Sequence, residues 1–340
     1  MPEQSNTEFV GTFSSNHLLH LMLGVANTQL LKVVAELGIA DLLSAGPLTV
    51  EYLASTCGAH PGSLCRVLRA LAVQDIFAEV EAGKFALTPT AALLKSDAVQ
   101  SLREYVILHA GIVQNAAWPQ LLQTVRTGTP AFDATYGDNI YEFLRKHPAD
   151  GEMFDLGMTS ISRVDNAEIH SAWDFSPYST VADVGGGRGL LLSSILAAYP
   201  QSRGILFDLP SVVEGAKEFI GSQDLDTRCQ IIGGDFTVSV PQGCDLYIFK
   251  RIFTSESDER VVTALGNCRE SMNRDGRVLT IEPNIGCEYG SLYDILMLAM
   301  TGGRLRDQQE YQKLFGQAGL EIARVVNTSS YLTIIESAPL

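Results

Sequence analysis

Hydrophobic and polar positions divide the chain into a helical first half and a second half of alternating strands and helices. From residue 176 onward, seven short apolar runs are separated by segments of helix length. This alternation predicts an α/β fold with a Rossmann-like seven-strand parallel sheet and helices on both faces. A short turn between the last two runs predicts a final antiparallel hairpin inserted in the sheet. The predicted strands are Thr180–Val184, Arg203–Phe207, Cys229–Ile232, Leu246–Phe249, Val278–Ile281, Leu320–Val325 and Tyr331–Ile335.

The pattern of residues 1–100 predicts a winged-helix dimerisation domain. His17–Leu37 has apolar positions around much of the helix circumference, which predicts a helix shared between subunits. Leu48–Ala54 and Ser63–Leu71 are typical of a helix-turn-helix, and Ile76–Leu87 alternates around an Ala-Gly pair as in a hairpin. The wing carries more acidic than basic residues, which favours a structural role over DNA binding.

Residues 101–175 predict a helical linker and substrate lid. Trp118 lies in an amphipathic run, and Tyr136–Leu144 and Gly151–Ile161 are expected to be helices. Met158 and Ser162 lie one helical turn apart, on one face. The third predicted domain, 176–340, holds the catalytic site, with a boundary near residues 174–178.

Charge and cysteine usage narrow the class of protein. The formal net charge is -15, which argues against nucleic acid and anionic membranes as partners. The six cysteines form no C-x-x-C pair and have no histidine at zinc spacing, so we expect reduced thiols, no metal site and a cytoplasmic protein. No signal peptide is expected, and no apolar run approaches the ~18 residues of a membrane span.

A glycine loop follows the first predicted strand. Its glycines, Gly185, Gly187 and Gly189, have the spacing G-x-G-x-G rather than the G-x-G-x-x-G of a dinucleotide site. Asp183 lies two residues before the loop. A carboxylate there suits the cationic amino group of S-adenosylmethionine (SAM), which carries no phosphate.

Further polar residues end the next three strands. Asp208 follows Gly185 by 23 residues, close to the spacing of a ribose-binding acid, although it could also cap the following helix. Asp235 and Phe236 offer an acceptor for the adenine amino group and a ring to cover its face. One of the cations Lys250 and Arg251 is expected to pair with the SAM carboxylate.

These motifs together resemble the plant-type small-molecule O-methyltransferases, which include caffeate O-methyltransferases and many bacterial natural-product enzymes. The resemblance covers nearly the whole chain, through DVGGGRG, LFDLPSVV, GGDF, LGNCRESM and RVLTIEP. It implies a SAM-binding homodimer whose N-terminal helices help to close the partner's active site. The resemblance implies that SAM contacts Gly185, Asp208, Asp235, Phe236 and Lys250. It also implies that Met158 and Ser162 touch both substrate and SAM. The residues implied to line the substrate pocket are Trp118, Phe154, Tyr293, Met297 and Met300.

The chain departs from the family where the general base is expected. The family run is roughly L-K-x-x-L-H-D-W-S-D-E, but Thr254 stands in place of the histidine. Of the two glutamates that orient this histidine, Glu282 is kept and Leu305 replaces the other. A threonine hydroxyl does not titrate near neutral pH, so it cannot supply the roughly 10²- to 10⁴-fold effect of a general base.

Two consequences for the reaction remain open at this stage. One is methyl transfer to an acidic hydroxyl or a ring nitrogen, which needs only positioning, with Arg251, Thr254 and Glu282 near the reacting atoms and Asp294 orienting the substrate. A looser resemblance to bacterial phenazine methyltransferases points to a fused nitrogen heteroaromatic. The other is a protein that keeps SAM without transferring methyl. Three histidines, His17, His20 and His109, are alternative bases.

Overall fold

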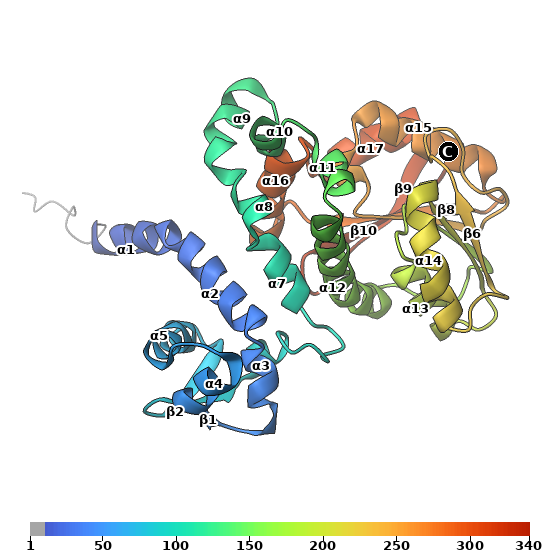
Figure 1. The fold of residues 1–340 in the computed structure, drawn as a ribbon. Coiled ribbons are helices and arrows are strands. Elements are labelled where there is room, and N and C mark those ends of the chain that lie inside the picture. Colours follow the sequence, from blue (N-terminus) through green and yellow to red (C-terminus); the bar gives the residue numbers. More distant parts are fainter. Residues whose placement is uncertain (1–10) are drawn as a thin grey trace, which may run out of the picture. The chain divides into compact units, whose positions relative to one another are not determined.

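The computed structural model describes residues 11–340 and shows an α/β protein (Figure 1). The chain forms two compact units. One comprises residues up to Asn115 together with Ala149–Ile161, and the other comprises Ala116–Pro148 and Ser162–Leu340. Helix α12 (Pro148–Ala172) contributes residues to both. No helix within residues 11–340 is long and apolar enough to cross a membrane.

The N-terminal unit begins with two helices, α1 (Gly11–Met22) and α2 (Gly24–Glu36). The expectation of one helix over His17–Leu37 is therefore wrong, because the chain leaves helical geometry at Leu23, just before a glycine that weakens a helix interior. Apolar side chains around this break are 54–71 % exposed in the single chain: Leu18, Leu19, Leu21, Met22, Leu23 and Val25.

The predicted helix-turn-helix and wing are confirmed. The Thr49 hydroxyl caps the first helix by accepting from the backbone N–H of Tyr52 at 3.4 Å. The wing turns at Gly83, with φ of 75°. Arg69 donates to both carboxylate oxygens of Glu79 in the wing. The elements are α3 (Ile39–Leu42), η1 (Leu43–Ala45), β1 (Leu48–Thr49), α4 (Val50–Cys57), α5 (Pro61–Ala72), β2 (Phe77–Glu81) and β3 (Lys84–Leu87).

The segment between wing and sheet is helical, as expected, but one predicted helix is divided. Instead of a helix over Tyr136–Leu144, one helix ends at Tyr136 and the next begins at Ile140. Gly137 ends the first in the left-handed region, and the Asn139 side chain caps the second. The helices are α6 (Pro89–Ala92), α7 (Arg103–His109), α8 (Ile112–Asn115), η2 (Trp118–Gln120), α9 (Leu121–Thr127), α10 (Ala131–Tyr136) and α11 (Ile140–Lys146).

The second unit contains the seven-stranded sheet, with strand order β6-β5-β4-β7-β8-β10-β9. The first five strands in this order are parallel, and β10 is antiparallel to both β8 and β9. The predicted hairpin inserted in the sheet is confirmed. The strands are β4 (Thr180–Val184), β5 (Arg203–Asp208), β6 (Cys229–Gly233), β7 (Leu246–Lys250), β8 (Arg277–Pro283), β9 (Leu320–Asn327) and β10 (Leu332–Pro339).

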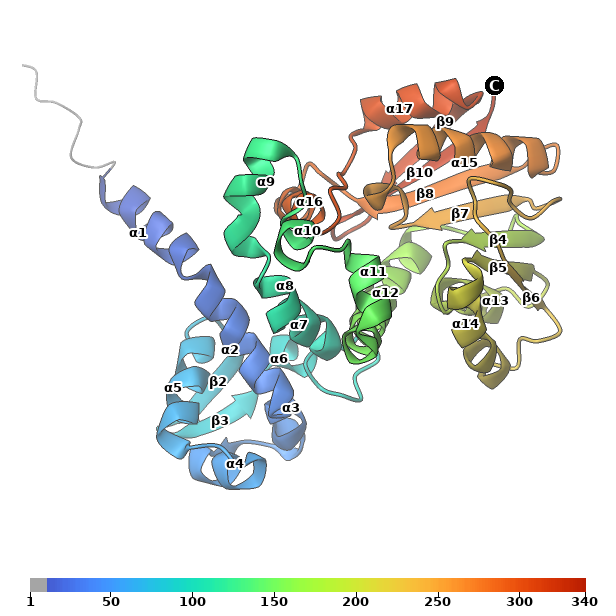
Figure 2. The same ribbon diagram turned by 45° about the horizontal axis from the view of Figure 1, so that its top comes forward.

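Helices cover both faces of this sheet (Figure 2). One face packs against the end of α12, α13 (Leu190–Ala198) and α14 (Pro210–Ser222), and the other packs against α15 (Asp258–Ser271) and α17 (Gln308–Gln317). Alternate residues of one strand serve the two cores, as Val181 and Ala182 do in β4. The parallel strands therefore end at one edge, where the loops, η3 (Phe253–Ser255) and α16 (Glu288–Met300) place the polar residues.

Candidate active site

A glycine loop joins β4 to α13 at the carboxyl edge of the sheet. Gly185, Gly187 and Gly189 have φ values of 72°, 59° and 82°, in the left-handed region that other residues rarely adopt. A Cβ on Gly185 would lie 2.4 Å from Ile252 Cδ1, so the neighbouring loop also requires a glycine there. The N–H of Gly187 donates to Asp208 Oδ2 at 2.8 Å and couples the loop to the end of β5.

Asp183 lies in β4 and is 2 % exposed. Its Oδ2 has no hydrogen-bond partner among residues 11–340. Burial raises the pKa of this carboxyl to about 6, although the charge of Lys250 opposes the rise. A buried carboxylate oxygen without a donor favours a cationic ligand at this end of the strand.

The carboxylates of Asp208 and Asp235, which follow the next two strands, already accept hydrogen bonds from neighbouring residues of the chain. Asp208 Oδ1 accepts from the backbone N–H of Leu209 at 2.7 Å, and burial raises the pKa of this carboxyl. Asp235 Oδ1 accepts from the hydroxyl and the backbone N–H of Thr237 at 2.7 and 2.8 Å, and these bonds lower its pKa. The ring of Phe236, beside Asp235, lies 5.8 Å from the guanidinium carbon of Arg260.

Lys250 ends β7, and its Nζ donates to the hydroxyl of Ser162 at 2.8 Å. Burial lowers the pKa of this ammonium. The contact joins two residues far apart in the chain that the sequence had placed in one site. Phe154 and Met158, on earlier turns of α12, belong to the N-terminal unit, and their role in the site stays a prediction.

Arg251 follows Lys250 and forms a buried ion pair that sequence reasoning missed. Its Nε donates to Asp165 Oδ2 at 2.7 Å, and the hydroxyl of Tyr331 donates to Asp165 Oδ1 at 2.6 Å. Burial alone would raise the pKa of Asp165, but the charges of Arg251 and Lys250 outweigh it and keep that pKa below its usual range. Asp165 lies three residues after Ser162 on one helix, but no spacing in the sequence pairs it with Arg251, 86 residues later.

Glu282 holds the loop that carries Thr254 through the residue before it. Glu282 Oε1 accepts from the backbone N–H of Phe253 at 2.9 Å, while Oε2 has no partner in the part of the chain that the structure describes. Thr254 is 2 % exposed and Glu282 is 3 % exposed. Burial raises the pKa of Glu282 to about 8, so this carboxyl is mostly protonated at neutral pH.

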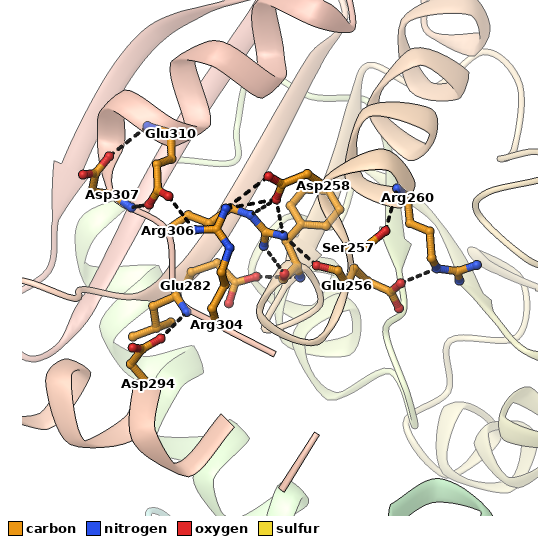
Figure 3. Close-up of polar contacts among 12 residues, drawn as sticks. Glu256, Ser257, Asp258, Arg260, Glu282, Asp294, Arg304, Arg306, Asp307 and Glu310 are labelled. Atoms are coloured by element: carbon orange, nitrogen blue, oxygen red, sulfur yellow. Dashed lines mark hydrogen bonds and ion pairs between the residues drawn. The ribbon is translucent and has the colours of Figure 1, made fainter. Parts of the chain in front are cut away.

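Arg306, a second residue that sequence reasoning missed, holds the same loop (Figure 3). Its side chain is 1 % exposed. It donates to the carbonyl of Phe253, to the carbonyl of Glu256 at 2.6 Å and to Asp258 Oδ1 at 2.9 Å. The loop that carries Thr254 is therefore fixed at both ends by one buried cation.

Helix α16 carries the other predicted substrate residues of this unit. Tyr293 and Met300 are buried and Met297 is half-buried. Burial raises the pKa of Tyr293 to about 12. Asp294, expected to orient the substrate, accepts from the backbone N–H of Leu305 at 2.6 Å through Oδ1, so it anchors the loop in which a leucine replaces the family glutamate.

Trp118 lies at the start of η2 and is half-buried. The six cysteines are free thiols. Within residues 11–340, no group of three or more His, Cys, Asp or Glu side chains is arranged to hold a metal ion.

Comparison with known proteins identifies the family. Residues 118–321 match the O-methyltransferase domain, and residues 19–97 match the O-methyltransferase dimerisation domain. The chain belongs to the O-methyltransferase family. It is a SAM-dependent methyltransferase, and its dimerisation domain supports the formation of a homodimer.

Relatives of this methyltransferase modify secondary metabolites. The chain is 38 % identical to the phenazine O-methyltransferase PhzM of Lysobacter antibioticus, over 96 % of both chains. It is 32 % identical to the phenazine-1-carboxylate N-methyltransferase of Pseudomonas aeruginosa, over 96 % of this chain and 97 % of that protein. The structure of CalO1, a methyltransferase of calicheamicin biosynthesis in its SAH-bound form, matches with a TM-score of 0.89 and 31 % identity, over 99 % of this chain and 100 % of that chain.

The residues at the carboxyl edge of the methyltransferase sheet fit SAM. Oδ2 of Asp183 has no donor among the described residues, and the ammonium group of the ligand would supply one. Lys250, at the end of β7, offers the opposite charge for its carboxylate. A Cβ on Gly187 would meet nothing within 4 Å, so the backbone there leaves room for a ligand.

Proposed function

We propose that this methyltransferase methylates a hydroxyl oxygen of a small aromatic or N-heteroaromatic natural product, such as a phenazine, without a histidine general base. The proposal is carried by two buried residues: Thr254, at the base position, and a mostly protonated Glu282, which holds the backbone of the residue before it. Neither side chain is a strong proton acceptor at neutral pH. The acceptor must therefore arrive already ionised or with an acidic hydroxyl.

In this proposal, Asp183, Gly185 and Gly187 hold the amino-acid end of SAM, and Asp208, Asp235 and Phe236 hold its nucleoside. Bound SAM supplies an electrophilic methyl group on a sulfonium. Lys250 and Ser162, joined at 2.8 Å, set one wall of the site. Positioning of two reactants alone contributes about 7–11 kcal/mol to lowering a barrier, so a site of this kind does not require a base when the acceptor is acidic.

The acceptor is proposed to lie near α16 and η3. Tyr293, Met297 and Met300 offer apolar surface, and Trp118 completes the proposed lining within the same unit. Arg251, Thr254 and Glu282 are the polar groups nearest to the proposed reaction. In the proposed homodimer, the exposed apolar residues of α1 pack against the partner subunit.

A second candidate is methylation of a ring nitrogen. The relative named phenazine-1-carboxylate N-methyltransferase favours it, and a ring nitrogen with a free lone pair needs no base at all. A third candidate, a SAM-bound protein that does not transfer methyl, rests on the absent histidine and on Leu305 in place of the second glutamate.

Methyl-labelled SAM separates these readings. The full-length protein is incubated with labelled SAM and a panel of phenols, acidic heteroaromatic hydroxyls and unsubstituted N-heteroaromatics, and the products are analysed by mass spectrometry. Label on oxygen supports the proposal, and label on nitrogen supports the second candidate. Conversion of an acceptor without S-adenosylhomocysteine release would favour the third and contradict methyl transfer.

A further inference from the structure

Five residues form a polar and aromatic group, the Arg251 cluster, at the carboxyl edge of the sheet. Arg251 follows β7, Asp165 lies on α12, and the remaining three are tyrosines. Tyr289 and Tyr293 lie on α16, and Tyr331 precedes β10. The Arg251 and Asp165 side chains are 5 % and 0 % exposed, whereas Tyr289 and Tyr331 are only half-buried. The two half-buried tyrosines are therefore the part of the cluster that solvent reaches.

The guanidinium group of Arg251 is only partly used by the protein. Nε and Nη2 donate to the two oxygens of Asp165 at 2.7 and 3.2 Å, and Nη2 also donates to the hydroxyl of Tyr331 at 3.3 Å. Nη1 is buried and has no hydrogen-bond partner among the described residues. Since a guanidinium carries five N–H groups, the two on Nη1 remain without an acceptor in surroundings where such a donor is costly.

Two aromatic rings limit how an acceptor can reach Nη1. The guanidinium carbon lies 5.1 Å from the ring centroid of Tyr293 and 5.5 Å from that of Tyr331. These rings attract the cation, and their hydroxyl groups also interact with it, but no acceptor among the described residues forms a hydrogen bond with Nη1. The free donors are therefore on the Nη1 edge, in a setting that suits a planar aromatic compound with an oxygen substituent.

The backbone of Arg251 supports a functional reading of this geometry. Its φ is 57°, in the left-handed region that a long side chain rarely adopts. Such a conformation persists only where the surrounding structure enforces it, and it is frequent at functional sites. Here the same residue also forms the buried ion pair to Asp165, so its backbone and its side chain are both constrained.

We propose that Nη1 of Arg251 binds an ionised oxygen substituent, a carboxylate or phenolate, of the aromatic acceptor. This inference rests on the proposed function and deepens it, because it makes an ionised oxygen the feature by which the site selects its substrate. A donor fixed in desolvated surroundings stabilises an anion more than a neutral group. Because the acceptor then binds in its ionised form, the site needs no base to remove a proton from it.

The test measures binding rather than turnover. Calorimetry is carried out on the full-length protein saturated with S-adenosylhomocysteine, using 1-naphthoate against 1-naphthamide for the carboxylate, and 4-nitro-1-naphthol against its methyl ether for the phenolate. We expect at least one ionised compound to bind about tenfold or more tightly than its neutral partner, as a charge-assisted hydrogen bond does. Equal affinities within both pairs would overturn the proposal.

Variants separate recognition from folding. Arg251→Gln alone leaves Asp165 buried and unpaired, so the Arg251→Gln/Asp165→Asn double variant keeps the cluster neutral and able to form hydrogen bonds. It should lose the preference for the ionised compound, whereas Tyr331→Phe, which disturbs the same cluster but keeps Nη1, should retain it. A preference that survives in the double variant would also overturn the proposal. Failure of methyl transfer in the labelled-SAM assay is a separate result, because these affinities do not depend on turnover.

Discussion

Glu282 Oε1 accepts a hydrogen bond from the backbone N–H of Phe253 at 2.9 Å, one residue before Thr254. In the family that this chain resembles, the corresponding glutamate orients a catalytic histidine. Here the same carboxyl holds the backbone of the loop instead, and its second oxygen has no partner within residues 11–340. One of the two glutamates that orient the base has therefore been kept, while the histidine itself and the second glutamate are absent.

The protonation of Glu282 makes a prediction about stability. Its folded pKa of about 8 lies above the ordinary value of 4.5, so the native state binds this proton more tightly than the unfolded state. The stabilisation of the folded state by this proton is fully present below pH 4.5 and is lost as the pH rises through about 8. Glu282→Gln keeps the acceptor for Phe253 and does not titrate. The variant should therefore gain about 3 kcal/mol in unfolding free energy relative to wild type between pH 5 and 7.5.

Urea denaturation at pH 5, 6.5 and 7.5, without SAM, measures this difference. The Glu288→Gln variant is the control, because this carboxyl is exposed at the start of α16, and it should show no such trend. A constant difference between Glu282→Gln and wild type over this range would contradict the raised pKa.

Arg306 and Arg304 allow a matched test of the loop anchor. Both contact Asp258, but the Arg306 side chain is 1 % exposed and that of Arg304 is 44 % exposed. Arg306→Met removes the donors to the carbonyls of Phe253 and Glu256, and should lower the unfolding free energy by about 2–4 kcal/mol. Arg304→Ala should lower it by less than about 1 kcal/mol. Urea titration measures both, and equal losses would argue against a special role for Arg306.

Asp208 is expected to govern affinity for SAM. Its carboxylate accepts from the backbone N–H groups of Gly187 and Leu209, so Asp208→Ala removes both the proposed ribose contact and the brace of the glycine loop. Calorimetry with S-adenosylhomocysteine should show a roughly 10- to 100-fold loss of affinity. Glu214→Gln, an exposed change on the adjacent α14, should leave the affinity unchanged. Wild-type affinity in Asp208→Ala would remove this residue from the proposed SAM site.

Much of the fold follows from local patterns in the sequence. Alternation of apolar runs and helices predicted all seven strands and the inserted hairpin, because buried parallel strands have a nearly continuous apolar signal. The break at Leu23 and the turn at Gly137 were missed, although each is marked by a glycine. In both places the apolar periodicity continues past the break, and this hid the interruption.

The sequence predicts those site residues whose position at the end of a strand is enough to suggest what they bind. Asp183, Asp208 and Lys250 are of this kind. Asp165, Arg306 and Tyr331 were not found, because their importance depends on partners more than 45 residues away in the chain. The ion pair of Arg251 with Asp165 illustrates the limit, since no spacing rule joins a helix residue to a loop after a distant strand.

The last prediction concerns the effect of restoring a histidine at position 254. Thr254→His places a titratable ring next to Phe253, from whose backbone N–H Glu282 accepts a hydrogen bond, and Oε2 of that carboxyl has no partner among residues 11–340 and is expected to orient the ring. For an unactivated phenol, kcat/KM should rise at least about tenfold, because a positioned base contributes roughly 10²- to 10⁴-fold and the larger side chain offsets part of this gain. An acidic hydroxyl, already ionised at the assay pH, should gain little. Thr254→Asn, which adds bulk and polarity without a titrating group, is the control, and equal rates for the two variants on the phenol would show that proton removal does not limit this enzyme.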